Sequence, residues 1–101
     1  MDAIAIIIPA YNEAQSIAAN LAVIRAAVDT IADTEFMLVV IDDGSHDDTG
    51  AIVRQLHSQD SRVQLLSMNR HYGKESAIAA GLQSTRHLDA VIVMDSDLQH
   101  P

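Results

Sequence analysis

A pair of acidic side chains near the end of the sequence has the spacing of a divalent-cation site. Asp95 and Asp97 come directly after the apolar run 91–94 and are separated only by Ser96. Two carboxylates at positions i and i+2 of a turn can both reach one hard cation, and Gln99 could add a neutral carbonyl oxygen. Oxygen ligands suit Mg²⁺ or Mn²⁺, with phosphate oxygens of a substrate in the remaining positions. Alone, such a pair is more often a solvated turn, but its position after a buried strand favours a metal site.

A second acidic cluster follows the apolar run 36–41. The carboxylates of Asp42 and Asp43 could accept hydrogen bonds from a nucleobase N–H or from ribose hydroxyls, as acidic residues do in dinucleotide sites. The alternative is helix capping, because acids in the first turn stabilise the helix that follows. We assign Asp47 and Asp48 mainly to capping, and we retain Asp42 and Asp43 as ligand candidates.

Two basic residues flank Gly73 at the start of a predicted helix. A helix N-terminus has free N–H groups and favours anions, so Arg70 and Lys74 are candidate contacts for a diphosphate or a sugar. An exposed pair of cations on a loop is an equally good interpretation. The sequence has neither the G-x-G-x-x-G string nor the P-loop string, which weakens the classical dinucleotide and P-loop interpretations. The histidines lack the spacing of metal ligands and are expected on the surface: His46, His57 and His71.

The elements that must position these residues alternate along the chain. Strands buried on both faces are predicted from continuous apolar runs: 3–9, 36–41, 63–68 and 90–94. Helices are predicted from apolar residues at steps of three and four: 13–31, 49–57 and 74–85. Asn12 with Gln15 resembles an N-cap and its return partner, and Gly44 is expected to adopt a positive φ. This alternation predicts an α/β fold of three layers, in which the polar clusters meet beyond the carboxyl ends of parallel strands.

The composition excludes several classes of protein. The chain has 101 residues, enough for one domain, and a net charge of −8 with histidine neutral. Nucleic-acid binders carry clustered cations, so none is expected here, and a phosphate partner should need a metal ion. Cysteine is absent, which excludes disulfides and thiolate metal sites. The apolar runs fall short of the roughly 20 residues that span a bilayer, and no signal peptide is recognisable, so we expect a soluble, cytoplasmic chain.

Four strings in this order and spacing resemble one family of enzymes. They are IIIPAYNE (6–13), VVIDDGSHDDT (39–49), NRHYGKESAIAAGL (69–82) and VMDSDLQHP (93–101). Together they are similar to the nucleotide-sugar-binding half of family-2 glycosyltransferases with the GT-A fold. The closest similarity is to the polyprenyl-phosphate hexosyltransferases, which include dolichol-phosphate mannose synthases and bactoprenol glucosyltransferases. The resemblance spans essentially the whole chain.

The resemblance implies a fold, a donor and a set of binding residues. It implies a Rossmann-like sheet ordered 3-2-1-4 and a UDP- or GDP-linked hexose held with Mg²⁺ or Mn²⁺. By motif match, Asp43 would face the base beside Asp42, and Lys74 would lie near the base or the phosphates. The nucleotide would be lined by Pro9, Tyr11 and Glu13. The metal ligands would be Asp95, Asp97 and Gln99.

The implied reaction is inverting transfer of a hexose to a polyprenyl phosphate. Members of the family continue beyond the DLQHP string into an acceptor-binding half, so we expect residues 1–101 to be the N-terminal part of a longer enzyme and inactive alone. The intact protein is expected at the cytoplasmic face of a membrane. We also expect the fourth strand to lack its usual cover, which would favour a homo-oligomer.

Two functions of other classes would use similar residues. A receiver-like signalling module also binds Mg²⁺ with paired aspartates on a parallel sheet. Its acid pair should follow the first strand, where Pro9 to Asn12 stand instead. A non-catalytic assembly domain would use its acids only for solubility, and replacing Asp95 and Asp97 would then leave its behaviour towards ligands unchanged.

Overall fold

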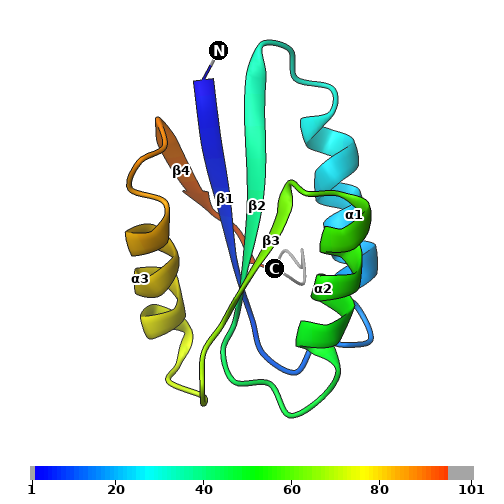
Figure 1. Cartoon of the computed structure of the whole chain (residues 1–101), viewed down its shortest axis with the longest axis vertical. Coiled ribbons are helices and arrows are strands. Elements are labelled where there is room, and N and C mark those ends of the chain that lie inside the picture. Colours follow the sequence, from blue (N-terminus) through cyan, green and yellow to red (C-terminus); the bar gives the residue numbers. More distant parts are fainter. Residues whose placement is uncertain (1, 96–101) are drawn as a thin grey trace.

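Four parallel strands form one sheet in the order β3-β2-β1-β4, which confirms the predicted order (Figure 1). The computed structural model describes residues 2–95. The strands are β1 (Asp2–Ala10), β2 (Thr34–Asp42), β3 (Val63–Ser67) and β4 (Ala90–Val93). The helices are α1 (Ile17–Val28), α2 (Thr49–Gln59) and α3 (Lys74–Ser84). The α/β class is therefore confirmed, with helices on both faces of the sheet.

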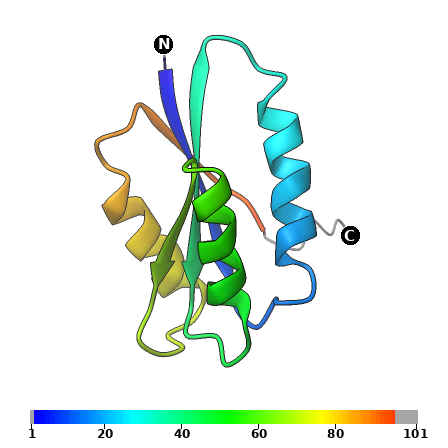
Figure 2. The same cartoon turned by 45° about the vertical axis from the view of Figure 1, so that its right-hand side comes forward.

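The two faces of the sheet bury different halves of each strand. Ile6 and Ile8 of β1 pack with α1 and α2, whereas Ile7 packs with α3. Figure 2 shows α1 and α2 on one side of the sheet and α3 on the other. Successive side chains of a strand point to opposite faces, so a strand covered on both faces must be apolar throughout. A Cβ at Gly81 of α3 would lie 2.8 Å from Cγ2 of Ile7, so this glycine lets the helix approach the sheet closely. Burying one such Ile side chain completely stabilises the fold by about 1.5–3 kcal/mol relative to leaving it exposed.

Helix α1 is shorter than the sequence pattern predicts. It begins at Ile17 with Ser16 as its N-cap and ends at Val28, so Ile31 lies beyond it and is half exposed. The predicted capping role of Asn12 is wrong. Asn12 adopts a positive φ of 52°, and its Oδ1 accepts a hydrogen bond from the N–H of His46 instead. The side chain of Asn12, which the local sequence pattern assigned to the start of the helix, therefore joins two loops instead.

At the amino ends of the strands, an ion-pair cluster connects α1 to the loop before β3. The guanidinium of Arg62 contacts Asp60 at 2.8 Å and Asp29 at 2.6 Å. The hydrogen bond from Arg62 lowers the pKa of Asp60 to about 2. Arg25 of α1 lies 3.6 Å from the same Asp60 carboxylate. This cluster stabilises the end of the sheet where the strands begin. The functional side chains singled out in the sequence lie at the opposite end, where the strands finish.

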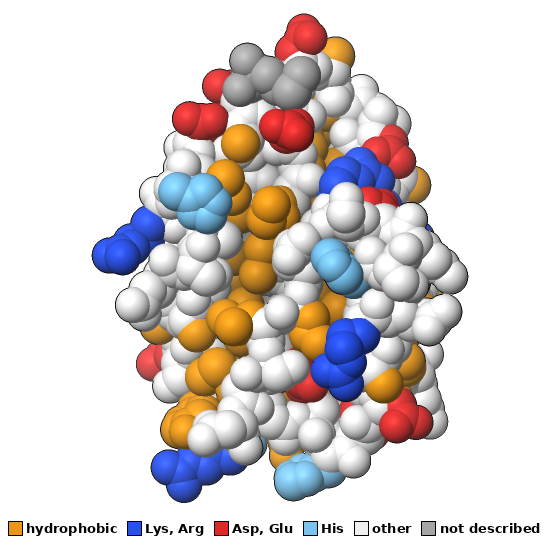
Figure 3. All heavy atoms as spheres, in the orientation of Figure 1, with side chains coloured by type: hydrophobic (Ala, Val, Ile, Leu, Met, Phe, Trp, Pro, Cys, Tyr) orange, Lys and Arg blue, Asp and Glu red, His pale blue; other side chains and the backbone are white. Residues whose placement is uncertain are grey.

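The two edge strands carry partly exposed apolar side chains. On β4, Ile92 and Val93 are 44% and 45% exposed. Figure 3 shows apolar side chains along the middle of one face, between α3 and α2. Among residues 2–95, no helix is long and apolar enough to cross a membrane.

Candidate functional site

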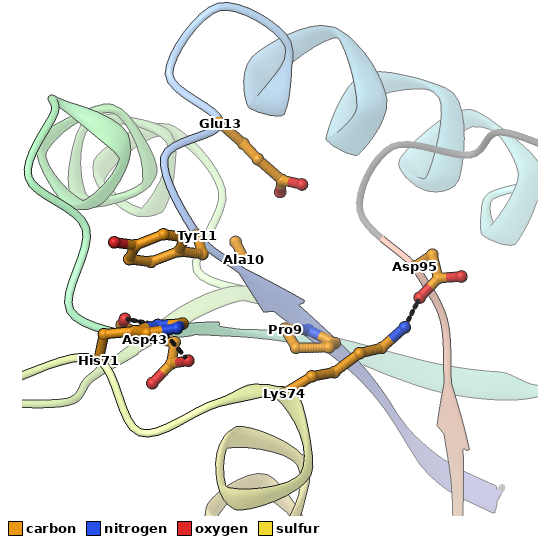
Figure 4. Close-up of a pocket in the computed structure, with 8 residues that line it drawn as sticks. All are labelled: Pro9, Ala10, Tyr11, Glu13, Asp43, His71, Lys74 and Asp95. Atoms are coloured by element: carbon orange, nitrogen blue, oxygen red, sulfur yellow. Dashed lines mark hydrogen bonds and ion pairs between the residues drawn. The ribbon is translucent and has the colours of Figure 1, made fainter.

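A cavity of about 260 Å³ opens beyond the carboxyl ends of β1, β2 and β4 (Figure 4). Its lining comes from the end of β1, from four loops and from the first turn of α3: Pro9, Ala10, Tyr11, Glu13, Asp43, His71, Lys74 and Asp95. This is the edge where ligands bind in open α/β sheets. Six of the residues singled out in the sequence line it, and they come from four separate strings.

The loop after β1 is fixed to the loop after β2 by hydrogen bonds. The N–H groups of Asn12 and Glu13 donate to the hydroxyls of Ser45 and Thr49, each at 2.9 Å. The N–H of Ala14 donates to Asp47 at 3.1 Å. These bonds satisfy the backbone where the strand has ended. They hold Tyr11 and Glu13, which line the cavity, in a defined position.

The two acids predicted to cap α2 behave differently. The carboxylate of Asp47 accepts from the N–H and the hydroxyl of Thr49, and this hydroxyl bond lowers the pKa of Asp47. Its other oxygen accepts from Ala14, so Asp47 both caps the helix start and joins the two loops. Asp48 occupies the N-cap position, as predicted, but makes no side-chain capping bond.

Asp42 and Asp43 point to opposite sides of β2. Asp42 is 8% exposed, and its carboxylate accepts from the N–H of Ser45 at 3.1 Å. A Cβ at Gly50 of α2 would lie 2.8 Å from its Oδ2, so the carboxylate packs against the start of that helix. Asp42 is not part of the cavity lining, whereas Asp43 is.

The carboxylate of Asp43 holds the loop before α3. It accepts hydrogen bonds from the N–H groups of Tyr72 and Gly73, each at 2.9 Å, and Nδ1 of His71 lies 2.9 Å from its Oδ2. Gly44 has the expected positive φ of 71°, and a Cβ there would lie 2.3 Å from the carbonyl carbon of Arg70. The loop therefore lies directly on the backbone that follows β2.

Two rings form one wall of the cavity. The rings of Tyr11 and His71 have centroids 4.0 Å apart and are tilted by 33° (Figure 4). The ring of His46 meets Tyr11 edge-on at 6.5 Å and is outside the lining. His71 was expected on the surface without a role, and its side chain is indeed 49% exposed. Its sequence neighbourhood was a usable signal, because it stands between the two cations assigned to a ligand.

The two predicted cations are placed differently. Lys74 begins α3 and lines the cavity, with its Nζ 2.6 Å from Oδ1 of Asp95. Arg70 does not line the cavity; its guanidinium lies 5.1 Å from the centre of the Tyr72 ring. An anion in the cavity would therefore meet the ammonium of Lys74 first.

One of the predicted metal ligands lies at the cavity. Asp95 follows β4, and its side chain is 58% exposed, so an oxygen donor suited to Mg²⁺ or Mn²⁺ is accessible there. Within residues 2–95, no group of three His, Asp or Glu side chains could hold a metal ion. Asp97 and Gln99 lie outside the described residues.

Comparison with known proteins identifies a family. A family model described as "Glycosyl transferase family 2" matches residues 5–101. The undecaprenyl-phosphate 4-deoxy-4-formamido-L-arabinose transferase of Shewanella sediminis is 39% identical, over 100% of this chain and 30% of that protein. The chain thus spans about 30% of the length of this curated relative.

Solved structures have the same fold. The mannosyltransferase PcManGT from Pyrobaculum calidifontis, in complex with GDP-Man and Mn²⁺, is 30% identical with a TM-score of 0.77, over 93% of this chain and 27% of that one. Glucosyl-3-phosphoglycerate synthase from Mycobacterium tuberculosis, in complex with UDP, is 28% identical with a TM-score of 0.64, over 99% of this chain and 35% of that one. These matches confirm the predicted GT-A-type fold.

Proposed function

The chain belongs to glycosyl transferase family 2, and from this we propose that its cavity binds a nucleoside-diphosphate sugar together with a divalent cation. The observation that carries the proposal is the meeting of Tyr11, Asp43, Lys74 and Asp95 in one cavity at the carboxyl edge of the sheet. An aromatic ring, a buried acid, an ammonium and an exposed carboxylate are the groups that a base, a diphosphate and a cation require.

The charges of the cavity explain why a cation is needed. Glu13, Asp43 and Asp95 bring three carboxylates to the lining against the one ammonium of Lys74. A diphosphate entering alone would be repelled by these carboxylates. We infer that Asp95, with Asp97 and Gln99, holds Mg²⁺ or Mn²⁺. When bound, the cation would stabilise the charge that develops on the leaving diphosphate.

The ends of the donor are assigned from the lining. The base lies on the side of Tyr11 and Asp43, and the phosphates lie beside Lys74 and Asp95. Pro9 and Glu13 complete the nucleotide side of the cavity. The complexes of PcManGT with GDP-Man and of the mycobacterial synthase with UDP support a nucleotide donor, with either base.

For the whole protein we propose inverting transfer of a hexose or a related sugar to a polyprenyl phosphate. The name of the Shewanella sediminis relative supports this acceptor. A phosphate acceptor is already ionised at neutral pH, so it needs a strong general base less than a hydroxyl would. The acceptor is a lipid, which places the reaction at a membrane surface. A receiver-like module is disfavoured, since β1 ends at Ala10 without an acid pair.

Calorimetric titration of the chain tests donor binding. We expect UDP-glucose or GDP-mannose to release heat in the presence of Mn²⁺ and to bind at least about tenfold more weakly after EDTA, because the diphosphate then meets the carboxylates unscreened. Circular dichroism confirms that the chain stays folded without the metal. The proposal fails if neither nucleotide sugar gives heat with Mn²⁺ while the fold is intact.

A further inference from the structure

We propose that Lys74 is an exchangeable counter-ion for Asp95, and that it couples the binding of a divalent cation to the binding of the donor diphosphate. The ammonium of Lys74 lies on the carboxylate that we assign to the cation. When both ligands bind, Lys74 leaves Asp95 and contacts the diphosphate. This inference rests on the proposed function of the cavity, and it gives a role to the ion pair that joins α3 to the end of β4.

The ion pair connects two elements that line the cavity. Lys74 is the first residue of α3, whereas Asp95 follows β4. Nζ of Lys74 donates to Oδ1 of Asp95 at 2.6 Å, and Figure 4 shows the lysine side chain extended towards this carboxylate. An ammonium in this position attracts the carboxylate as a metal cation would. The ammonium and a metal cation therefore compete for Asp95.

The exposure of the pair makes the contact easy to break. The two side chains are 60% and 58% exposed, so water screens their attraction. An exposed pair of this kind changes an equilibrium by at most about fivefold, which is too little to hold α3 in place. Helix α3 is positioned instead by the close approach of Gly81 to Ile7. Lys74 has a flexible four-carbon stem, so its ammonium can leave Asp95 without a movement of the backbone.

The charges of the lining make this exchange productive. Among residues 2–95, Lys74 is the only lysine or arginine that lines the cavity. While Lys74 is paired with Asp95, its charge is largely neutralised and attracts a diphosphate only weakly. When Asp95 binds a divalent cation, Lys74 is released for the diphosphate. When Lys74 contacts the diphosphate, Asp95 is released for the cation. Each ligand should therefore raise the affinity for the other, because coupling between two sites is reciprocal.

Lys74→Gln tests the exchange, because it should change two affinities in opposite directions. The substitution removes the ammonium and keeps a side chain that favours helix. We expect Mn²⁺ alone to bind about three- to fivefold more tightly, since Asp95 no longer has to release a counter-ion. At saturating Mn²⁺ we expect UDP or GDP to bind about tenfold more weakly, since a charged hydrogen bond to the diphosphate is lost. Electron paramagnetic resonance of free Mn²⁺ measures the first affinity, and calorimetry measures the second.

Two further variants separate the exchange from a general effect of charge. Arg70→Gln removes the same charge from the loop before α3 but lies outside the lining, so it should bind Mn²⁺ alone like the parent chain. Lys74→Arg keeps a cation on the same helix turn, so it should bind Mn²⁺ alone no more tightly than the parent chain. Circular dichroism confirms that each variant is folded.

The outcomes distinguish this inference from the proposed function. The exchange is refuted, and donor binding stands, if the parent chain binds UDP or GDP with Mn²⁺ but Lys74→Gln gains no affinity for Mn²⁺ alone. The same conclusion follows if Arg70→Gln gains as much affinity as Lys74→Gln, or if Lys74→Gln binds the nucleotide as tightly as the parent chain. If the folded parent chain binds neither nucleotide with Mn²⁺, both the exchange and the proposed function fail.

Discussion

Asp95→Asn should remove the metal-dependent part of nucleotide-sugar binding. The substitution keeps the shape of the side chain but removes the charge that a hard cation requires. Asp95 is 58% exposed and its described partner is Lys74, so the fold should be unaffected. We expect affinity for the donor in Mn²⁺ to fall by at least about 10- to 100-fold, the cost of disturbing groups that merely support metal ligands. Calorimetry with and without EDTA measures the change.

Asp48→Asn is the matched control for this result. Asp48 is exposed at the same edge of the sheet, lies outside the cavity lining and makes no side-chain capping bond. The two variants change the net charge equally, so a general effect of charge would weaken donor binding in both. If Asp48→Asn weakens binding as much as Asp95→Asn, the specific role of Asp95 is refuted.

Gly44→Ala should give the largest loss of stability among the substitutions near the cavity. Gly44 has a φ of 71°, and the added Cβ would lie 2.3 Å from the backbone carbon of Arg70. Strain at a positive φ and overpacking against immobile backbone each cost about 1–3 kcal/mol, so the free energy of unfolding should fall by about 3 kcal/mol or more. Urea denaturation followed by circular dichroism measures this loss.

Gly73→Ala separates the two causes of that loss. Gly73 also has a positive φ, of 109°, but a Cβ there would have no atom within 4 Å. Only the conformational cost remains, which we expect to be about 1–3 kcal/mol and smaller than the total loss in Gly44→Ala. Equal losses in the two variants would mean that the loop before α3 yields to the added methyl group, and that Gly44 does not fix the position of His71.

The order of the elements could be predicted because it depends on long apolar runs. The apolar runs in β1 and β2 are buried on both faces, a pattern that indicates strands and not amphipathic helices. The positions of these strands and the convergence of the polar clusters could therefore be predicted. The strand order itself came from the resemblance to a family. Sequence alone could not predict where α1 begins, because the competing contact of Asn12 with His46 joins residues far apart in the chain.

The division of roles between neighbouring residues also escaped prediction. The residue pattern alone left Asp42 and Asp43 as equal candidates, and only the resemblance to the family favoured Asp43. The structure turns Asp42 towards α2 and Asp43 towards the cavity, in keeping with the two-residue period of a strand. The period shows that only one can face the cavity, but not which one. The pairing of Asp43 with His71 depends on how the loop before α3 returns to β2, and no local pattern determines that.

The most direct test of the central claim maps where a nucleotide binds. Titrating the ¹⁵N-labelled chain with Mg²⁺ and UDP or GDP should shift the amide resonances of Tyr11, His71, Lys74 and Asp95, which meet in the cavity. The amide of Arg62, at the opposite end of the sheet, should not move. Shifts centred on Arg62, or none for either nucleotide in the folded chain, would contradict a nucleotide-binding cavity at the carboxyl edge of the sheet.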